Sequence, residues 1–344
     1  MKLVRSFAGG ALAAAVLAIA APADAQAVTL RIESNLPAPV ATSMSMQIFK
    51  DEVARLSGGS IEVEVVAGAP LGLKEMADAV HVGSVFATWT SVDYFSRLVP
   101  EIAAVSLPFV FDNYDEARRA VSGPVGSLIA RKLDAKGFIV LAWMDLGEFH
   151  VINSKRPLKT LDDFKGLRIR VLPNATHLAT FEALGARAVA MDFKDVEAAV
   201  RQGDIDGEEM DYSVTYANKY YESQKYVSDT RQFLDFNLFI ANKSAFASLN
   251  PVQQKAVREA AAIAALQERK ISTEQEATAL ARLQAKGMQF DPLSPETRVA
   301  LRRATASVVA DVKKWVGADV VNKVLAANRV PAAVKVSGAK GSHR

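Results

Sequence analysis

Side chains that could carry out chemistry are few in this chain, and their spacing matches no common active-site motif. The four histidines, His81, His150, His177 and His343, form no H-E-x-x-H or similar metal-binding pattern. The absence of cysteine excludes disulfides, thiolate metal sites and a cysteine nucleophile. Neither a G-x-S-x-G nor a G-x-x-x-x-G-K-[ST] motif occurs. We therefore expect no catalytic residue, no metal and no cofactor, and we interpret each histidine as a surface or hydrogen-bonded residue.

An acidic run occupies residues 204–211 and contains Asp204, Asp206, Glu208, Glu209 and Asp211. Such a run could bind a cation. It lacks the glycine and glutamate positions of a calcium-binding loop. The pattern therefore favours a solvated turn with one or two structural carboxylates.

Two arginines, Arg168 and Arg170, alternate with apolar residues in a strand-like segment. Side chains alternate across a strand, so the two arginines point to opposite faces. A guanidinium group presents paired N–H donors that match the two oxygens of a carboxylate. The residues alone leave open whether Arg170 binds a ligand carboxylate or pairs with an acidic side chain on the surface.

The elements that would position these residues alternate between strands and helices, which indicates an α/β fold. Alternating or continuous apolar residues predict strands at 28–32, 61–65, 85–89, 138–144, 168–172, 187–191 and 233–241. Helical spacing predicts helices at about 46–56, 74–81, 176–184 and 195–202. The run from Leu107 to Phe111 is expected to be buried.

The C-terminal third is predicted to be helical. Asn250 can cap a helix that has Pro251 at its first position, and the helical pattern continues to Lys286. A helix of this length spans about 54 Å, which exceeds a small lobe, so it is expected to brace two lobes. The sequence also allows a break near Ser272 and Thr273. A final helix is predicted from Pro295 to Gly317.

The N-terminus has the features of a secretory signal peptide: two basic residues, a short apolar run and small residues around Ala25 and Ala27. Residues 1–27 are therefore predicted to be removed, which places the mature protein in the periplasm. The net charge of +3 is mild and the basic residues are not clustered, so nucleic acid binding is not expected. Residues 331–344 are predicted to form a flexible tail.

At Gly166–Val171 the sequence resembles the DctP-type solute-binding proteins of TRAP transporters, which carry a G-x-[KR]-[IL]-R-V stretch. The same order of family motifs continues with a helix ending in L-G-A at 184–186, M-x-[FW] at 191–193 and Asp206-Gly207-Glu208-Glu209, which resembles the family's V-D-G-Q-E. Further matches occur at 70–72, 107–111, 153–157 and 220–226, so the resemblance covers almost the whole mature chain.

The resemblance implies two α/β lobes, joined by hinge strands and a long helix, that close over a ligand. It implies that the second arginine of the motif, Arg170, binds the ligand carboxylate, and that Arg168 is structural. Other positions carried over from the family are Asn35, a wall of the first lobe from Trp89 to Ser91, and a wall of the second lobe with Phe193 and Met210. Core packing is the alternative for each of these positions.

Two departures from the family pattern bear on the ligand. Many members have a second arginine in a G-x-R context, where this chain has Phe149 or His150, depending on a one-residue gap. Many also have asparagine after the Q-E pair, where this chain has Met210. The resemblance thus favours a monocarboxylate with an apolar or aromatic body, such as a 2-oxo or 2-hydroxy acid, over a dicarboxylate or sugar acid.

The expected protein is a monomeric periplasmic solute-binding protein that delivers a small organic acid to the membrane subunits of a TRAP transporter. Its first lobe is predicted to contain residues 28–147 and 236–275, and its second lobe residues 148–235 and 276–330. The alternatives are a binding protein that serves a sensor or another type of transporter, and a secreted enzyme.

Overall fold

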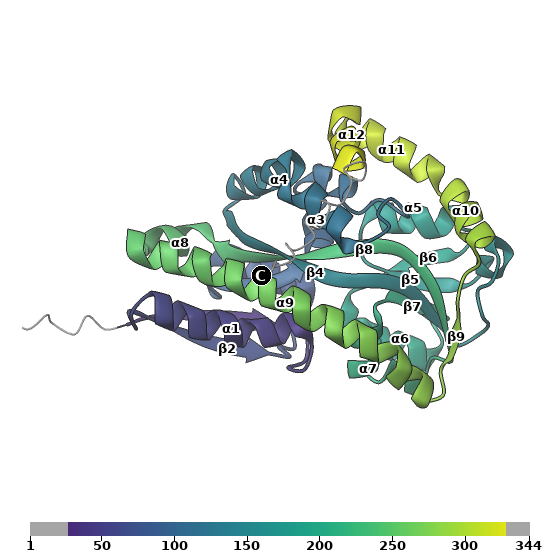
Figure 1. The fold of residues 1–344 in the computed structure, drawn as a ribbon, viewed down its shortest axis with the longest axis horizontal. Helices are drawn as coiled ribbons and strands as arrows, with labels where there is room; N and C mark the ends of the chain where they lie inside the picture. Colours follow the sequence, from purple (N-terminus) through teal and green to yellow (C-terminus); the bar gives the residue numbers. More distant parts are fainter. Residues whose placement is uncertain (1–26, 328–344) are drawn as a thin grey trace, which may run out of the picture.

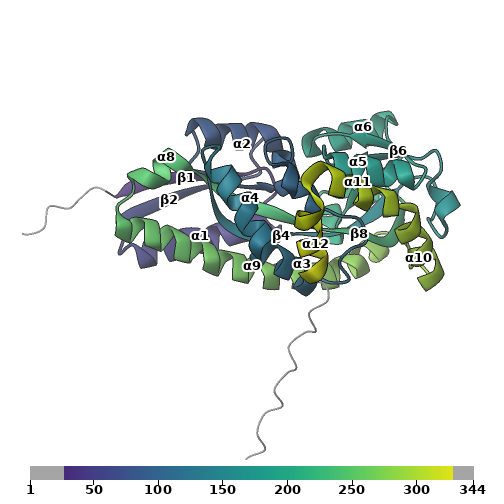
Figure 2. The same ribbon diagram turned by 90° about the horizontal axis from the view of Figure 1, so that it is seen from above.

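One mixed sheet runs through an elongated molecule, with α1, α8 and β2 at one end and α6, α10 and β6 at the other (Figures 1 and 2). This computed structural model describes residues 27–327, so the predicted tail and almost all of the predicted signal peptide lie outside the described residues. Within the described range, no helix is both long enough and apolar enough to span a membrane.

The strand order places two parallel groups on either side of two crossing strands. β1 is parallel to β2 and β3, and β5 is parallel to β6 and β7, whereas β8 is antiparallel to β3 and β4. The order across the sheet is β2 (Ile61–Ala67), β1 (Val28–Ser34), β3 (Ala87–Ser91), β8 (Tyr226–Asn242), β4 (Phe138–Asn153), β7 (Gly207–Met210), β5 (Arg168–Val171) and β6 (Arg187–Ala190), and β9 (Gln289–Asp291) also pairs with β8. This arrangement gives the two-lobed α/β fold that the sequence predicted.

The crossing strands β4 and β8 are longer than their apolar runs predicted. Each continues past the apolar residues into a segment with more polar side chains, and both segments stay buried along much of their length. The β4–β8 ladder shifts register at three points, one of them between Asp145 and Gly147. Such irregularities bend a strand locally.

Helices and short 3-10 turns cover the sheet. The helices predicted at about 46–56, 74–81, 176–184 and 195–202 are present close to those residues, whereas the helices at 114–122, 124–134, 212–217 and 243–248 were not predicted. Asn174 caps α5, where its side chain accepts a hydrogen bond from the Thr176 amide, and Gly203 ends α6 in the left-handed region. These elements are α1 (Ala41–Leu56), α2 (Leu73–Val82), η1 (Val92–Phe95), η2 (Pro100–Ala104), α3 (Tyr114–Ser122), α4 (Pro124–Asp134), η3 (Leu161–Phe164), α5 (Ala175–Ala183), η4 (Phe193–Asp195), α6 (Val196–Gln202), α7 (Tyr212–Ala217), η5 (Tyr220–Glu222) and α8 (Lys243–Ser248).

The predicted long helix is α9 (Pro251–Ala285), and it continues through residue 272 without a break. Near its start, the Gln253 side chain donates a hydrogen bond to the carbonyl of Ser60, beside β2. Near its end, the Glu276 carboxylate accepts hydrogen bonds from the amides of Tyr212 and Ser213 in α7. The helix therefore contacts elements on both sides of the crossing strands, and Figure 1 shows it lying along the molecule.

The prediction of one final helix is wrong. The chain forms α10 (Pro295–Ala304) and α11 (Ala306–Val316), which are separated at Thr305, and then α12 (Ala318–Ala327). Valines of α11 and α12 pack in one core cluster with residues of α3 and α4, which belong to the predicted first lobe. The two helices thus pack against segments that the sequence analysis placed in the first lobe, although it placed the helices themselves in the second.

Candidate functional site

A small cavity lies where the two parallel groups of strands meet the crossing strands. Its lining comes from both groups: Trp89 and Ser91 on β3, Arg170 on β5, and Met210 on β7. The remaining lining residues are Asn35, Leu36, Leu73, Leu146, Phe149, Leu172, Phe193, Asp211, Val214 and Asn237. A ligand in this cavity would contact both parts of the molecule at once.

Seven of the eight predicted binding residues line this cavity, and His150 does not. The structure thus brings together segments near residues 35, 90, 149, 170, 193 and 210, as the family resemblance implied.

The guanidinium group of Arg170 is buried, with only 1% of the residue exposed. Its Nε donates a hydrogen bond to the carbonyl of Met191 at 3.0 Å, which holds the side chain in place. Its Nη2 has no hydrogen-bond partner within the described chain. Among the lining residues of the described chain, Arg170 is the only cation. A buried donor without a partner is costly, so this group is available to an anion that enters the cavity.

Arg168, on the other face of β5, has an internal partner. Its Nε and Nη2 donate hydrogen bonds to the two carboxylate oxygens of Asp206, at 3.1 and 2.7 Å. The Arg168 guanidinium lowers the pKa of this carboxyl group. Arg168 is therefore a structural residue, as predicted.

Phe149, and not its neighbour, lines the cavity at the position where many family members have a second arginine. The His150 ring instead stacks on Tyr212 with ring centroids 3.9 Å apart, and its Nδ1 lies 3.2 Å from the Asp229 carboxylate. His150 is thus committed to a buried internal pair, so its predicted place in the binding site is corrected here.

The acidic run is not the solvated turn that the sequence predicted. Residues 207–210 form the buried strand β7, and Asp206, Glu208, Glu209 and Asp211 are all buried. Asp206 pairs with Arg168, Glu209 lies 2.6 Å from the Nδ1 of His177, and Asp211 caps α7. Asp206 and Glu209 are thus buried with partners from distant parts of the chain, whereas the partners of Asp211 are local.

Glu208 lies beside Arg170 because these two residues pair across β5 and β7. Neither of its carboxyl oxygens has a hydrogen-bond partner in the described chain. Burial raises the pKa of Glu208 to about 8, although the Arg170 charge acts in the opposite direction. At neutral pH the side chain is therefore mostly uncharged, and the positive charge of Arg170 is not neutralised by its neighbour.

Two pairs of side chains join the opposite walls near the cavity. The Nζ of Lys194 in η4 lies 2.9 Å from a carboxylate oxygen of Glu75 in α2. The Tyr94 hydroxyl donates a hydrogen bond to Asp192 at 3.2 Å. Because these two contacts bridge the opposite walls, the cavity is closed in this structure.

The sequence analysis missed several lining residues, among them Asn237 and Asp211. Asn237 had a usable signal, because Asp235 and Asn237 are the polar residues of the otherwise apolar run 233–241 and lie two positions apart on one strand face. Five aliphatic lining residues could not have been found in this way, because an aliphatic side chain in a sequence can equally belong to the core. These are Leu36, Leu73, Leu146, Leu172 and Val214.

These features define a class of protein, the two-lobed α/β binding proteins that enclose a small molecule between lobes. Residues 38–314 match the family described as bacterial extracellular solute-binding protein, family 7. The chain therefore belongs to this family, and the predicted resemblance is confirmed.

Individual relatives agree with this assignment. A solute-binding protein of Verminephrobacter eiseniae is 32% identical over 301 residues, covering 87% of this chain and 89% of the relative. The sugar acid binding protein of Advenella mimigardefordensis, in complex with galactonate, has a TM-score of 0.86 at 29% identity, covering 89% of this chain and 99% of that one. A TRAP periplasmic solute-binding protein of Ralstonia eutropha, with bound (S)-2-acetolactate, has a TM-score of 0.82 at 30% identity, covering 87% and 98%.

Proposed function

We propose that this protein is the periplasmic binding protein of a TRAP transporter and that it captures a small monocarboxylate with an apolar body, of the 2-oxo or 2-hydroxy acid class. The observation that carries this proposal is the buried Nη2 of Arg170, which has no partner in the described chain and belongs to a residue that lines the cavity. An arginine can bind both oxygens of a carboxylate.

The chemistry of the lining supports one carboxylate and not two. Arg170 has no second cation beside it among the lining residues of the described chain, because Phe149 stands at the position of the second family arginine. Much of the remaining wall is aliphatic or aromatic. A second carboxylate would therefore be desolvated without a partner, which is costly.

Two further polar groups support an oxygen substituent next to the carboxylate. The Trp89 Nε1 and both side-chain atoms of Asn35 are buried without partners in the described chain, and both residues line the cavity. A 2-oxo group would accept hydrogen bonds from these donors, and a 2-hydroxyl group could also donate to the Asn35 oxygen. The Ralstonia relative with bound (S)-2-acetolactate, a 2-hydroxy monocarboxylate, supports this class.

We assign residues 28–147, 236–275 and the helices α11 and α12 to the first lobe, and residues 148–235 with 276–305 to the second. We further propose that the mature protein begins after the signal peptide at residue 26 or 28, acts as a monomer, has no catalytic activity, and docks on the membrane subunits of the transporter.

A thermal-shift screen of organic acids on the mature protein tests the ligand class. Small 2-oxo and 2-hydroxy monocarboxylates are expected to raise the apparent melting temperature, because a ligand that binds only the folded protein stabilises it by mass action. C4-dicarboxylates and sugar acids are expected to have smaller effects. A larger shift with the dicarboxylates would contradict the proposed class.

The ligand is also expected to hold the lobes closed. It contacts both walls of the cavity, so it binds the closed state more tightly than an open one. Small-angle scattering should show a smaller radius of gyration on addition of the best ligand from the screen. An unchanged profile at saturating ligand, together with a ligand-free profile that does not match the closed structure, would contradict closure.

Ligand affinity is expected to fall as pH rises through about 8, the pKa of Glu208. Above this pH Glu208 ionises, and its carboxylate competes with the ligand for Arg170. The ligand itself is ionised throughout this range. If ionised Glu208 excludes the ligand, a single titration with this pKa lowers affinity by about tenfold between pH 7 and pH 9. Calorimetry at several pH values measures this change.

Glu208→Gln is the matched control for this prediction, because glutamine is the residue at this position of the family motif and does not titrate. We expect the variant to bind the ligand with nearly the same affinity at pH 7 and pH 9. The same alkaline loss in the variant as in the wild type would assign the titration to another group.

A further inference from the structure

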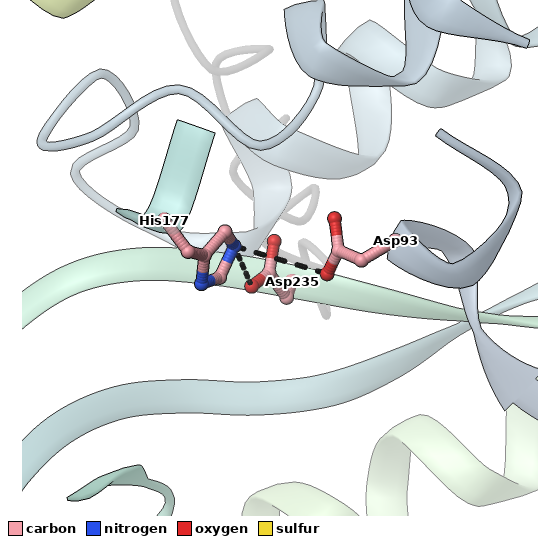
Figure 3. Close-up of side chains that lie close together, drawn as sticks. All are labelled: Asp93, His177 and Asp235. Atoms are coloured by element: carbon pink, nitrogen blue, oxygen red, sulfur yellow. Dashed lines mark ion pairs between the residues drawn. The ribbon is translucent and has the colours of Figure 1, made fainter. Parts of the chain in front are cut away.

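A second cluster of polar side chains lies behind the cavity wall, and three distant parts of the chain supply it. Asp93 comes from η1, His177 from α5 and Asp235 from β8, and their side chains point toward one another (Figure 3). At most 1% of each side chain is exposed. Ser91 and Phe149, which line the cavity, contact Asp93 and His177 respectively.

The donor atoms of the cluster have separations that suit a metal ion. The Nε2 of His177 lies 3.2 Å from the Oδ2 of Asp235 and 3.8 Å from the Oδ2 of Asp93. One donor atom from each residue lies within 4.8 Å of the other two. Tetrahedral zinc with bonds of about 2.0–2.1 Å places its donors about 3.3 Å apart, so small shifts would complete the coordination.

Several of these buried donor atoms have no partner outside the cluster. Apart from the ion-pair contacts of the Nε2 of His177 with the two aspartates, neither this nitrogen nor the carboxylate oxygens of Asp235 have a hydrogen-bond partner in the described chain. An unpartnered carboxylate in a buried site is costly, and a cation in contact with it offsets that cost. These atoms point toward one another, so an ion would bind between the three residues.

Neighbouring groups already orient the donors as in a metal site. The Nδ1 of His177 lies 2.6 Å from the Oε1 of Glu209, which also accepts a hydrogen bond from the Leu172 amide. A proton on Nδ1 that is donated to Glu209 leaves the lone pair of Nε2 directed at the two aspartates. This carboxylate–histidine arrangement is typical of the groups around a protein-bound zinc ion.

Asp93 is oriented in the same way. Its Oδ1 accepts hydrogen bonds from the hydroxyl of Ser106 and from the side-chain amide of Asn174. Its Oδ2 accepts one hydrogen bond, from the Ser91 hydroxyl, and keeps lone-pair capacity toward His177.

We propose that Asp93, His177 and Asp235 bind one divalent cation of the zinc class. A set of one imidazole and two carboxylates suits zinc better than calcium or magnesium, which prefer oxygen ligands alone. Asp93 follows β3 in the first lobe, His177 belongs to the second, and Asp235 lies on a crossing strand. The ion would therefore tie the two lobes together beside the hinge.

Zinc titration of the mature protein after treatment with EDTA tests the site. We expect one Zn²⁺ per chain by calorimetry, and Co²⁺ in its place is expected to show the visible absorption of a tetrahedral site. Asp235→Asn and His177→Gln should weaken Zn²⁺ binding at least tenfold. Glu209→Gln should weaken it by about tenfold to a hundredfold, because the orienting partner of the histidine is lost.

His150→Gln is the matched control. His150 is also buried and also paired with a carboxylate, Asp229, but it is not part of the cluster. This variant should bind Zn²⁺ like the wild type. Circular dichroism checks that each variant is folded, and if His177→Gln does not fold, the more conservative Asp235→Asn decides the question.

Two results would overturn the proposal. One is the absence of Zn²⁺ uptake by the folded wild type, in which case a protonated His177 compensates the carboxylates. The other is binding of Zn²⁺ to folded Asp235→Asn with wild-type affinity and stoichiometry, which would place the ion elsewhere.

Discussion

Arg170→Ala is expected to weaken binding of the small carboxylate by about tenfold to a hundredfold. The loss of a hydrogen bond to a charged group costs about 1.5–3 kcal/mol, and each 1.4 kcal/mol is a factor of ten in affinity. No other cation lines the cavity within the described chain, so nothing there can replace the guanidinium group. Calorimetry with the best ligand from the thermal-shift screen measures the change.

Arg170→Lys is expected to weaken binding as well, because an ammonium group keeps the charge but loses the paired geometry. Arg168→Ala is the matched control on the opposite face of the same strand. It breaks the partly exposed pair with Asp206 and should lower stability slightly, while the ligand binds nearly as to the wild type. If folded Arg170→Ala binds like the wild type and Arg168→Ala does not bind, the anchor is wrongly assigned.

The main architecture could be predicted from the sequence because its signals are local. Apolar periodicity indicated most of the strands, and Asn250 with Pro251 marked the start of α9 correctly. The position of Arg170 in the cavity followed from the order of the family motifs. Thr305 shows the limit of such patterns, because the periodicity of α10 and α11 continues across the residue where the two helices separate.

The buried acids could not be predicted because their burial depends on residues far away in the sequence. Glu209 is buried through His177, 32 residues earlier in the chain, and the cluster around His177 also includes Asp93 and Asp235. From local sequence alone, a run of carboxylates with no visible partner was interpreted as a solvated turn, and the structure shows that this prediction is wrong. Only the folded chain shows that the partners exist.

Gly147 stands where β4 crosses the cavity, and its replacement by alanine is expected to destabilise the protein by about 2–4 kcal/mol. Its φ of 140° lies in a region that side chains rarely adopt, and such strain costs about 1–3 kcal/mol. An added Cβ would also lie 2.5 Å from the Cβ of Asp211 and 2.9 Å from its Cγ. Asp211 would have to move, which would disturb its cap on α7, a contact worth about 1 kcal/mol.

Urea unfolding of Gly147→Ala and Gly203→Ala separates the two causes. Gly203 also has a positive φ, of 73°, but an added Cβ there meets no atom within 4 Å, so only backbone strain of about 1–2 kcal/mol is expected. Gly147→Ala should also bind the ligand more weakly than Gly203→Ala, because Asp211 lines the cavity and is displaced in the closed state. If the two variants are equally stable and bind the ligand equally well, β4 must accommodate the added Cβ at residue 147 without moving Asp211. The contact between Gly147 and Asp211 would then not determine ligand affinity.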